Sequence, residues 1–342
     1  MTVGGVEYVA ECFQKILGGD IVAFQPNEKV KFLLFDRNKP ELSPKKALNI
    51  KNQYLPLNPT FYIKLLKKIL NSKKILIHMP TLGGFIAIFL SFLLLKKIIV
   101  FQHSRSPTKI GKIFFFITYL LARFEFLKII VTSKHEQKFS RLSKYSIVIN
   151  LPLSNDRKFS FEENIIGDRL KLVFIGRLVP YKGILEFLDS LNELIKKNLI
   201  KKKIELTIIG EGELKREIIK RKERTNFQIN ISSWLTESEK FKKISESNAL
   251  VLPSINSGEA FGLVQLDALT VGRPVLLKKQ SSGTQDYAWK NPVVFRYNNE
   301  DLEISLNNLI DFIEQSPSGT IFNKALNKYS FENFKSSIIK FL

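Results

Sequence analysis

Short apolar runs alternate with longer amphipathic stretches along the chain, and this alternation constrains the fold more than any other feature. Strands that alternate with helices predict parallel sheets with helices on both faces. The predicted strands form two series, at 21–24, 32–35, 75–78, 98–102, 129–132 and 147–150, and then at 171–175, 204–209, 228–231, 249–252, 274–277 and 293–295. Helical periodicity fills gaps between them at 6–17, 59–70, 183–197, 212–224, 238–247 and 262–271.

The two series predict an α/β protein with two doubly wound domains. A chain of 342 residues has the length of about two domains. The pattern is interrupted near 151–168, where Pro152, Asn155 and a run of charges break it. We therefore expect a first domain over 1–155 and a second over 168–328.

Positive charge is concentrated in the first domain. The net charge is +21, and residues 1–150 hold 24 basic and 8 acidic residues. This asymmetry indicates a polyanionic partner, such as an anionic membrane surface. A lysine-rich composition could supply much of the lysine excess, but it does not explain the asymmetry. No RNA-binding aromatic motif accompanies the charge, which disfavours nucleic acid. One cysteine and three histidines give little basis for a disulfide framework or a metal centre built on Cys and His.

Two apolar segments, 83–95 and 113–121, are shorter than the ~20 residues needed to span a bilayer. Each is either a buried helix of the α/β domain or an interfacial helix. The second is the better interfacial candidate, because it is flanked by Lys109, Lys112, Arg123 and Lys128.

The second domain contains a strand-to-helix segment with two cations, 174–183. The strand is expected to end at Gly176 and the helix to start near Gly183. Ligands of open α/β sheets bind at the carboxyl ends of strands, where Arg177 and Lys182 would lie. A diphosphate is a suitable ligand for such a pair, although two surface cations beside a turn would look the same.

A second such segment, 252–269, carries two carboxylates. We expect a helix to open around Phe261 and Gly262, where free backbone N–H groups favour an anion. Glu259 would lie just before the helix and Asp267 about two turns along the same face. Carboxylates suit sugar hydroxyls, but a capping role for Glu259 and a plain polar role for Asp267 are the alternatives.

These motifs together resemble glycosyltransferase family 4, the retaining nucleotide-sugar transferases of GT-B fold. The resemblance rests on Gly-Arg-Leu-x3-Lys-Gly at 176–183, Ile-Gly-Glu-Gly at 209–212, Leu-Pro-Ser at 252–254, Glu-Ala-Phe-Gly-Leu-Val-x2-Asp-Ala-Leu at 259–269 and Gly-Arg-Pro-Val at 272–275. It implies two Rossmann-like domains facing across a cleft, with the C-terminal helix at 329–342 crossing back to the first domain.

The resemblance also implies roles for residues of the second domain. Arg177 and Lys182 match the pair that holds the donor diphosphate, and Glu259 matches the acid that binds the transferred sugar and supports the transition state. Asp267 matches the ribose-binding acid, where glutamate is usual. Donor contacts are further implied for the backbone amides of Phe261, Gly262 and Leu263, and for Thr284 within 282–284.

In the first domain, Gly4 and Gly5 resemble the family's glycine-rich loop, which brings backbone close to the phosphates. His103 matches a histidine that lies over the transferred sugar, although Ser104 stands where an aspartate commonly follows. His78 and His135 are expected to be structural. The family has a strand before its glycine loop, and only three residues precede Gly4, so we expect this first strand to be missing through a truncated N-terminus.

The implied activity is that of a hexosyltransferase which retains the anomeric configuration and uses a UDP-, GDP- or TDP-linked sugar. We expect no cofactor and no metal, because no Asp-x-Asp lies in a metal-binding context. Charge favours a lipid-linked oligosaccharide acceptor and a cytoplasmic, peripheral location at the inner face of the plasma membrane, as in bacterial O-antigen or capsule assembly. The alternatives are a non-catalytic sugar-nucleotide-binding protein and, less favoured, a sugar-nucleotide epimerase.

Overall fold

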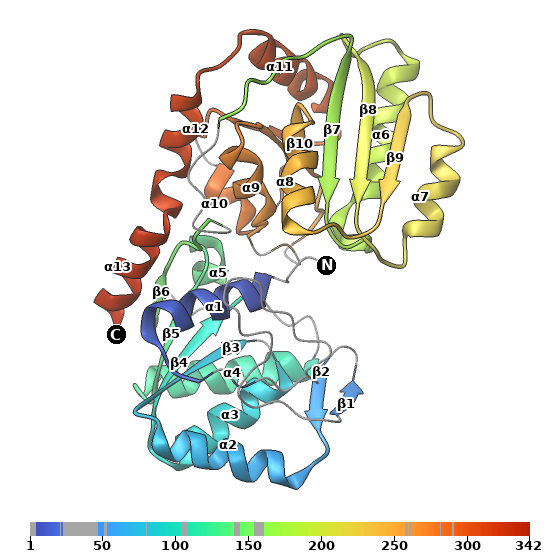
Figure 1. Ribbon diagram of the computed structural model, residues 1–342. Coiled ribbons are helices and arrows are strands. Elements are labelled where there is room, and N and C mark those ends of the chain that lie inside the picture. The colour runs from blue at the N-terminus through green and yellow to red at the C-terminus, as the bar shows by residue number, and fades with distance from the viewer. Residues whose placement is uncertain are drawn as a thin grey trace. The chain divides into compact units, whose positions relative to one another are not determined.

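In the computed structural model the chain divides into two compact units (Figure 1). The N-terminal unit runs to Leu151 and includes Ser337–Leu342, and the C-terminal unit is Pro152–Ser336. The structure describes residues 5–20, 22, 47–50, 53–79, 81–103, 109–139, 144–153, 161–256, 259, 261–280, 282–288 and 291–342.

The N-terminal unit contains a parallel sheet of four strands in the order β3-β4-β5-β6. The strands are β3 (Lys74–Met79), β4 (Lys97–Gln102), β5 (Leu127–Val131) and β6 (Ser146–Val148). They are connected by α3 (Leu82–Leu93), α4 (Lys109–Arg123) and α5 (Lys134–Phe139). Each connection steps to the next strand in the same direction, so right-handed crossovers place these helices on one face of the sheet.

Four further elements of this unit precede the sheet in sequence: α1 (Gly5–Leu17), β1 (Ala47–Ile50), β2 (Gln53–Pro56) and α2 (Pro59–Asn71). β1 and β2 form an antiparallel pair that the sequence did not predict, because four-residue strands leave no clear alternation. Asn58 caps α2, whose start is further favoured by Pro59. The strands predicted at 21–24 and 32–35 lie outside the described residues, except Val22, which packs beside α2.

The C-terminal unit contains a parallel sheet of six strands in the order β12-β11-β10-β7-β8-β9. The strands are β7 (Arg169–Ile175), β8 (Lys203–Ile209), β9 (Gln228–Ser232), β10 (Ala249–Leu252), β11 (Val275–Lys278) and β12 (Val294–Tyr297). Burial is complete along β10 and from Leu172 to Ile175 of β7, as expected of central strands covered on both faces.

Helices cover both faces of this sheet (Figure 1). One core cluster joins β7 and β8 to α6, α7 and α11, while α8 packs against α9. The helices are α6 (Ile184–Lys196), α7 (Lys215–Lys222), α8 (Glu237–Ser245), α9 (Val264–Thr270), α10 (Thr284–Ala288), α11 (Leu302–Glu314) and α12 (Gly319–Leu326), with short 3-10 turns η2 (Pro180–Lys182) and η3 (Asn327–Tyr329).

The last helix, α13 (Phe331–Phe341), ends on the N-terminal unit. Lys74 Nζ donates a hydrogen bond to the Leu342 carbonyl at 3.2 Å, and the Lys128 ammonium lies 5.3 Å from the centre of the Phe341 ring. The final residues of the chain therefore belong to the unit that begins it.

The predicted fold class is confirmed, because both units are α/β with parallel sheets. The predicted helix start around Phe261–Gly262 is wrong by a few residues, since α9 begins at Val264. Among the helices that the structure describes, none combines the length and the hydrophobicity needed to cross a bilayer.

Candidate functional site

The strand order of the C-terminal sheet reverses between β7 and β10, which are neighbours. From β7 the chain proceeds to β8 and β9 on one side, and it then returns to β10 on the other. Ligands of open α/β sheets bind outside the carboxyl ends of the strands, at the point where the strand order reverses. Gly176 follows β7 and Pro253 follows β10, so both charged motifs begin at this switch point.

The two motifs pack directly against each other. Gly183 has φ +66°, and a Cβ at this position would overlap the carbonyl oxygen of Pro253. The backbone N–H of Ile255 donates to the Tyr181 carbonyl at 2.9 Å. Glycine at 183 therefore allows the loop after β7 to lie on the loop after β10.

Lys182 and Glu259 form a buried ion pair between Nζ and Oε2. Ser254 Oγ donates to the same carboxylate oxygen at 3.2 Å. The sequence predicted both charged residues for the site, but it gave no reason to expect that they contact each other. The carboxylate is thus held in one orientation by two donors from the two motifs.

Arg177 lies exposed at the same edge of the sheet. Its Nη2 donates to the Tyr181 hydroxyl at 2.7 Å, and its guanidinium carbon is 5.7 Å from the centre of that ring. The Lys182 ammonium is 5.6 Å from the same ring centre. Tyr181 therefore holds two cations near each other, an arrangement that suits a ligand with adjacent negative charges.

Asp267 lies on α9 and is paired with a lysine that the sequence analysis missed. Lys240 on α8 is buried, and its Nζ lies 2.8 Å from Asp267 Oδ2 and 2.8 Å from Glu237 Oε2. Burial lowers the pKa of Lys240, but attraction to Asp267 and Glu237 outweighs burial, so the pKa is raised. Lys240 therefore stays protonated and holds α8 to α9.

The loop before α9 brings the remaining predicted residues of this unit together. Glu259 lies in the loop before the helix, as expected, but α9 begins only at Val264, so Asp267 lies in the first turn of the helix and not two turns along it. Gly262 has φ +72°, and a Cβ there would come within 3.3 Å of the Thr284 side chain. Thr284 is buried and its hydroxyl lies 2.7 Å from that of Ser282. Phe261 and Leu263 flank Gly262 in this loop.

His103 follows β4 in the N-terminal unit and contacts His78 on β3. His103 Nε2 and His78 Nδ1 are 2.8 Å apart, and the backbone N–H of His103 donates to the Met79 carbonyl at 2.9 Å. In the parallel register of β3 and β4, His78 lies opposite Phe101. His103 comes two residues after Phe101, so it lies beside His78. The sequence could have indicated this contact, because the two histidines lie at the carboxyl ends of two successive predicted strands.

Burial lowers the pKa of His78 to about 4. Burial, and then the charge of His78, lower the pKa of His103 well below its ordinary value. Both imidazoles are therefore neutral near pH 7, which is the state in which one ring nitrogen can donate to the other. Of the other residues predicted in this unit, Gly5 begins α1, whereas Gly4 and Ser104 lie outside the described residues.

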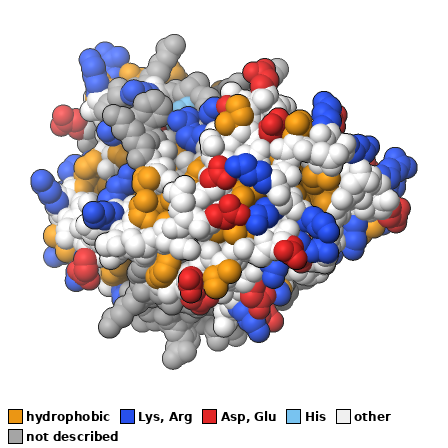
Figure 2. Space-filling view, turned by 90° about the horizontal axis from the view of Figure 1, so that it is seen from above, with side chains coloured by type: hydrophobic (Ala, Val, Ile, Leu, Met, Phe, Trp, Pro, Cys, Tyr) orange, Lys and Arg blue, Asp and Glu red, His pale blue; other side chains and the backbone are white. Residues whose placement is uncertain are grey.

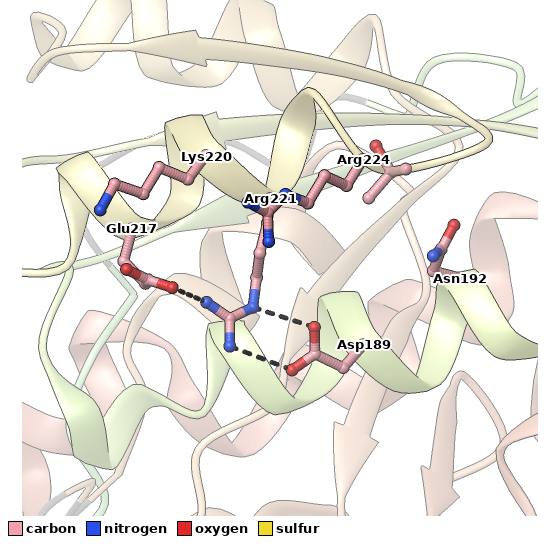
Figure 3. A pocket seen from close by; sticks show the side chains of 7 residues that line it. Asp189, Asn192, Glu217, Lys220, Arg221 and Arg224 are labelled. Carbon is pink, nitrogen blue, oxygen red and sulfur yellow. Dashed lines mark hydrogen bonds and ion pairs between the residues drawn. The ribbon is translucent and has the colours of Figure 1, made fainter.

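A separate pocket lies between α6 and α7 (Figure 3). Arg221 crosses it and pairs with Asp189 at 2.9 Å and with Glu217. Lys220 and Arg224 also line it, but none of the predicted site residues does. Its central cation, Arg221, is thus paired with two carboxylates.

The family model described as "Glycosyl transferases group 1" matches residues 155–327, half of the chain. The chain belongs to this family of glycosyltransferases. The match spans both charged motifs, so Arg177, Lys182, Glu259 and Asp267 lie within the region that defines the family. No curated protein sequence matches the chain.

Solved structures of GT-B glycosyltransferases share the fold of this group 1 transferase. The apo form of the lipopolysaccharide outer core galactosyltransferase WaaB has a TM-score of 0.68 at 16% identity, over 99% of this chain and 96% of WaaB. TarM has a TM-score of 0.64 at 18% identity, over 84% of this chain. The pneumococcal O-GlcNAc transferase GtfA, solved with UDP and GlcNAc, has a TM-score of 0.56 at 13% identity, over 85% of this chain.

The match covers only 59% of the TarM chain and 61% of the GtfA chain, so the present chain corresponds to a part of each. At such identities the likeness concerns the fold alone. The solved structures therefore show that the chain has the GT-B fold, and the family match shows that it belongs to the group 1 glycosyltransferase family.

Proposed function

We propose that the protein is a retaining hexosyltransferase of family 4, which moves a hexosyl unit from a nucleotide sugar to a lipid-linked saccharide. The observation that supports this most strongly is the cluster at the switch point, in which Arg177, Lys182 and Glu259 lie within two contacting loops. TarM and GtfA have been solved in complex with UDP, which supports a nucleotide-linked donor.

In this proposal the two cations stabilise the leaving diphosphate. Arg177 contacts phosphate oxygens through its planar fork, and Lys182 shares its ammonium between phosphate and Glu259. Charge that develops on the leaving group is thereby offset by groups already in place. Glu259 binds the transferred sugar and stabilises positive charge at its anomeric carbon, while Asp267 binds the ribose.

In the N-terminal unit, His103 is proposed to bind the transferred sugar. A neutral imidazole can donate one hydrogen bond to a sugar hydroxyl without placing a cation beside the oxocarbenium-like centre. The reaction in this proposal needs no metal and no cofactor, since Lys182 and Arg177 supply the positive charge.

The test is donor turnover by wild type and by Glu259→Gln, measured as nucleotide release from UDP-, GDP- and TDP-linked hexoses. We expect Glu259→Gln to lower kcat at least 100-fold, on the scale of losing one stabilising group, and EDTA to leave the wild-type rate within twofold. Glu193→Gln, on the exposed side of α6, is the matched control and should behave as wild type. Nucleotide binding without turnover of any donor would instead favour a non-catalytic sugar-nucleotide-binding protein.

The acceptor is proposed to be a lipid-linked saccharide in bacterial surface polysaccharide synthesis, reached from the cytoplasm at the inner face of the plasma membrane. The excess of basic residues in 1–150 supports an acceptor that carries a pyrophosphate and lies in an anionic membrane. We expect kcat/KM for a polyprenyl-diphosphate-linked saccharide to exceed that for the free saccharide more than tenfold. Equal values would overturn this part of the proposal.

A further inference from the structure

Exposed apolar side chains are concentrated in one of the two units. Of the 21 large hydrophobic side chains that are exposed in the described part of the chain, 15 belong to the N-terminal unit. Scattered exposed leucines need no explanation, but a contiguous group on neighbouring helices does.

On α3 the side turned away from the sheet is as apolar as the side that packs on it. Ala87 and Ile88 are buried against the strands, whereas Phe89 is 61% and Leu93 60% exposed. The helix ends in a Schellman turn, in which the Lys96 N–H donates to the Ser91 carbonyl at 3.0 Å. Leu95 takes the left-handed position of this turn, with φ +50°, and is 86% exposed. Glycine would fit that position with less strain, so the exposed leucine side chain is not explained by the turn itself.

On α4 an apolar stripe also faces outward. Ile113, Phe116 and Ile117 are exposed at helical spacing, while Ala122 is buried in the same cluster as Ala87. α3 and α4 cover the same face of the sheet, and the Phe92 and Phe126 rings meet edge to face, with centres 5.1 Å apart, where the two helices end. We call the exposed apolar side chains of these two neighbouring helices and the turn after α3 the α3–α4 face, which comprises Phe89, Leu93, Leu95, Ile113, Phe116 and Ile117.

The segment that forms this face is almost free of negative charge. Residues 47–128 contain 13 lysines and arginines and one acidic residue, Glu125. Such segregation is not general in this protein, because acidic and basic side chains are interspersed on the face seen in Figure 2. Lys96 and Arg123 lie at the ends of the two helices.

We propose that the α3–α4 face docks on an anionic lipid surface, with its apolar side chains inserted at the level of the headgroups. Apolar side chains flanked by cations are the pattern of interfacial helices, which bind through buried apolar area and attraction to anionic lipids together. A protein partner would be expected to meet this basic segment with a complementary acidic surface, whereas a lipid plane supplies both the negative charge and the apolar layer. The docking deepens the proposed function, since it brings the chain to a lipid-linked acceptor, but its geometry does not depend on the chemistry at the switch point.

The test is co-sedimentation of the full chain with vesicles of phosphatidylcholine alone or with 30% phosphatidylglycerol. Wild type is expected to bind the anionic vesicles at least tenfold more tightly, and to lose most of this advantage in 0.5 M salt. Leu95→Gly is the most informative variant, because it relieves a strained position while removing an apolar side chain. We expect it to unfold no earlier than wild type and to bind anionic vesicles several-fold more weakly, and Leu95→Gly with Phe116→Ser to bind more than tenfold more weakly.

Ile304→Ser is the matched control, because Ile304 lies on α11 of the other unit and is 61% exposed, close to the 58% of Phe116. This variant should bind as wild type. The proposal is overturned if wild type ignores anionic vesicles at low salt, or if the double variant binds as wild type. It is also overturned if the double variant abolishes self-association of the free chain while leaving vesicle binding unchanged, because the face would then be a contact between copies. Vesicle binding without any nucleotide turnover would leave this proposal standing and overturn the proposed function instead.

Discussion

At the scale of single residues, the site is defined by opposite charges that neutralise each other. Lys182 and Glu259 are 77 residues apart in the chain, and Lys240 and Asp267 are 27 apart. The motifs identified three of these residues, but Lys240 lies in a lysine-rich helix whose other lysines are exposed or pair at the surface. The sequence pattern does not distinguish Lys240 from its solvated neighbours, because its burial depends on the packing of α9 against α8.

Removing Lys182 should destabilise the fold as well as the site. Lys182→Met leaves the Glu259 carboxylate buried with only the Ser254 hydroxyl, and the loss of one partner of a buried pair costs about 3 kcal/mol. The double variant Lys182→Met, Glu259→Gln should recover more than half of this loss. The free energies of unfolding of wild type, Lys182→Met and the double variant are compared by urea unfolding. A value for Lys182→Met within about 0.5 kcal/mol of wild type, as for an ordinary surface substitution, would contradict the prediction.

The two histidines predict a pH dependence of stability. The pKa of His78 is about 4 in the folded state and about 6.5 when unfolded, so the unfolded chain binds the proton more readily. The stability from a neutral His78 is complete above pH 6.5 and is lost as the pH falls towards 4, by roughly 3 kcal/mol. His78→Gln should reduce but not abolish this dependence when urea midpoints are compared at pH 7 and pH 4.5, because burial also lowers the pKa of His103. An equally steep fall in the variant would show that other groups cause it.

At the scale of elements, loops that follow parallel strands are positioned by close backbone contacts. The sequence predicted β7 and β10 and the helices after them, because long apolar runs and helical periodicity are strong signals. It placed the start of α9 incorrectly, since the loop from Glu259 to Leu263 is held by the ion pair with Lys182 and by the packing of Gly262 beside Thr284. Neither contact is local, and both override the periodicity that suggested an earlier helix start.

Gly183 gives a prediction at this scale. Gly183→Ala places a Cβ in a left-handed residue and against the Pro253 carbonyl, so the loop after β7 must move away from the loop after β10. We expect a loss of stability of about 2 kcal/mol or more and weaker nucleotide binding. Gly167→Ala is the control, because a Cβ there would meet no atom within 4 Å. Equal melting temperatures for the two variants would refute the role given to Gly183.

At the scale of the whole molecule, the alternation of strands and helices was sufficient to predict two parallel sheets. It did not predict the β1–β2 pair, whose strands have four residues each, or the contact between His78 and His103. The β1 and β2 strands are too short to show an alternation of apolar and polar residues. The contact between the two histidines depends on the register of β3 and β4. The charge asymmetry of the sequence, in contrast, coincides with the unit that exposes most apolar side chains.

The most direct test of the account is a thermal-shift panel with UDP, GDP, TDP and ADP, on wild type and on Arg177→Ala. A nucleotide at 100 times its Kd adds about 2.7 kcal/mol to stability, which corresponds to about 5 °C or more in Tm. We predict that one nucleotide gives this shift with wild type and that Arg177→Ala reduces it by more than half, with the variant's own Tm unchanged. If no nucleotide shifts the wild-type Tm, the cluster at the switch point is not a donor site, and the central claim fails.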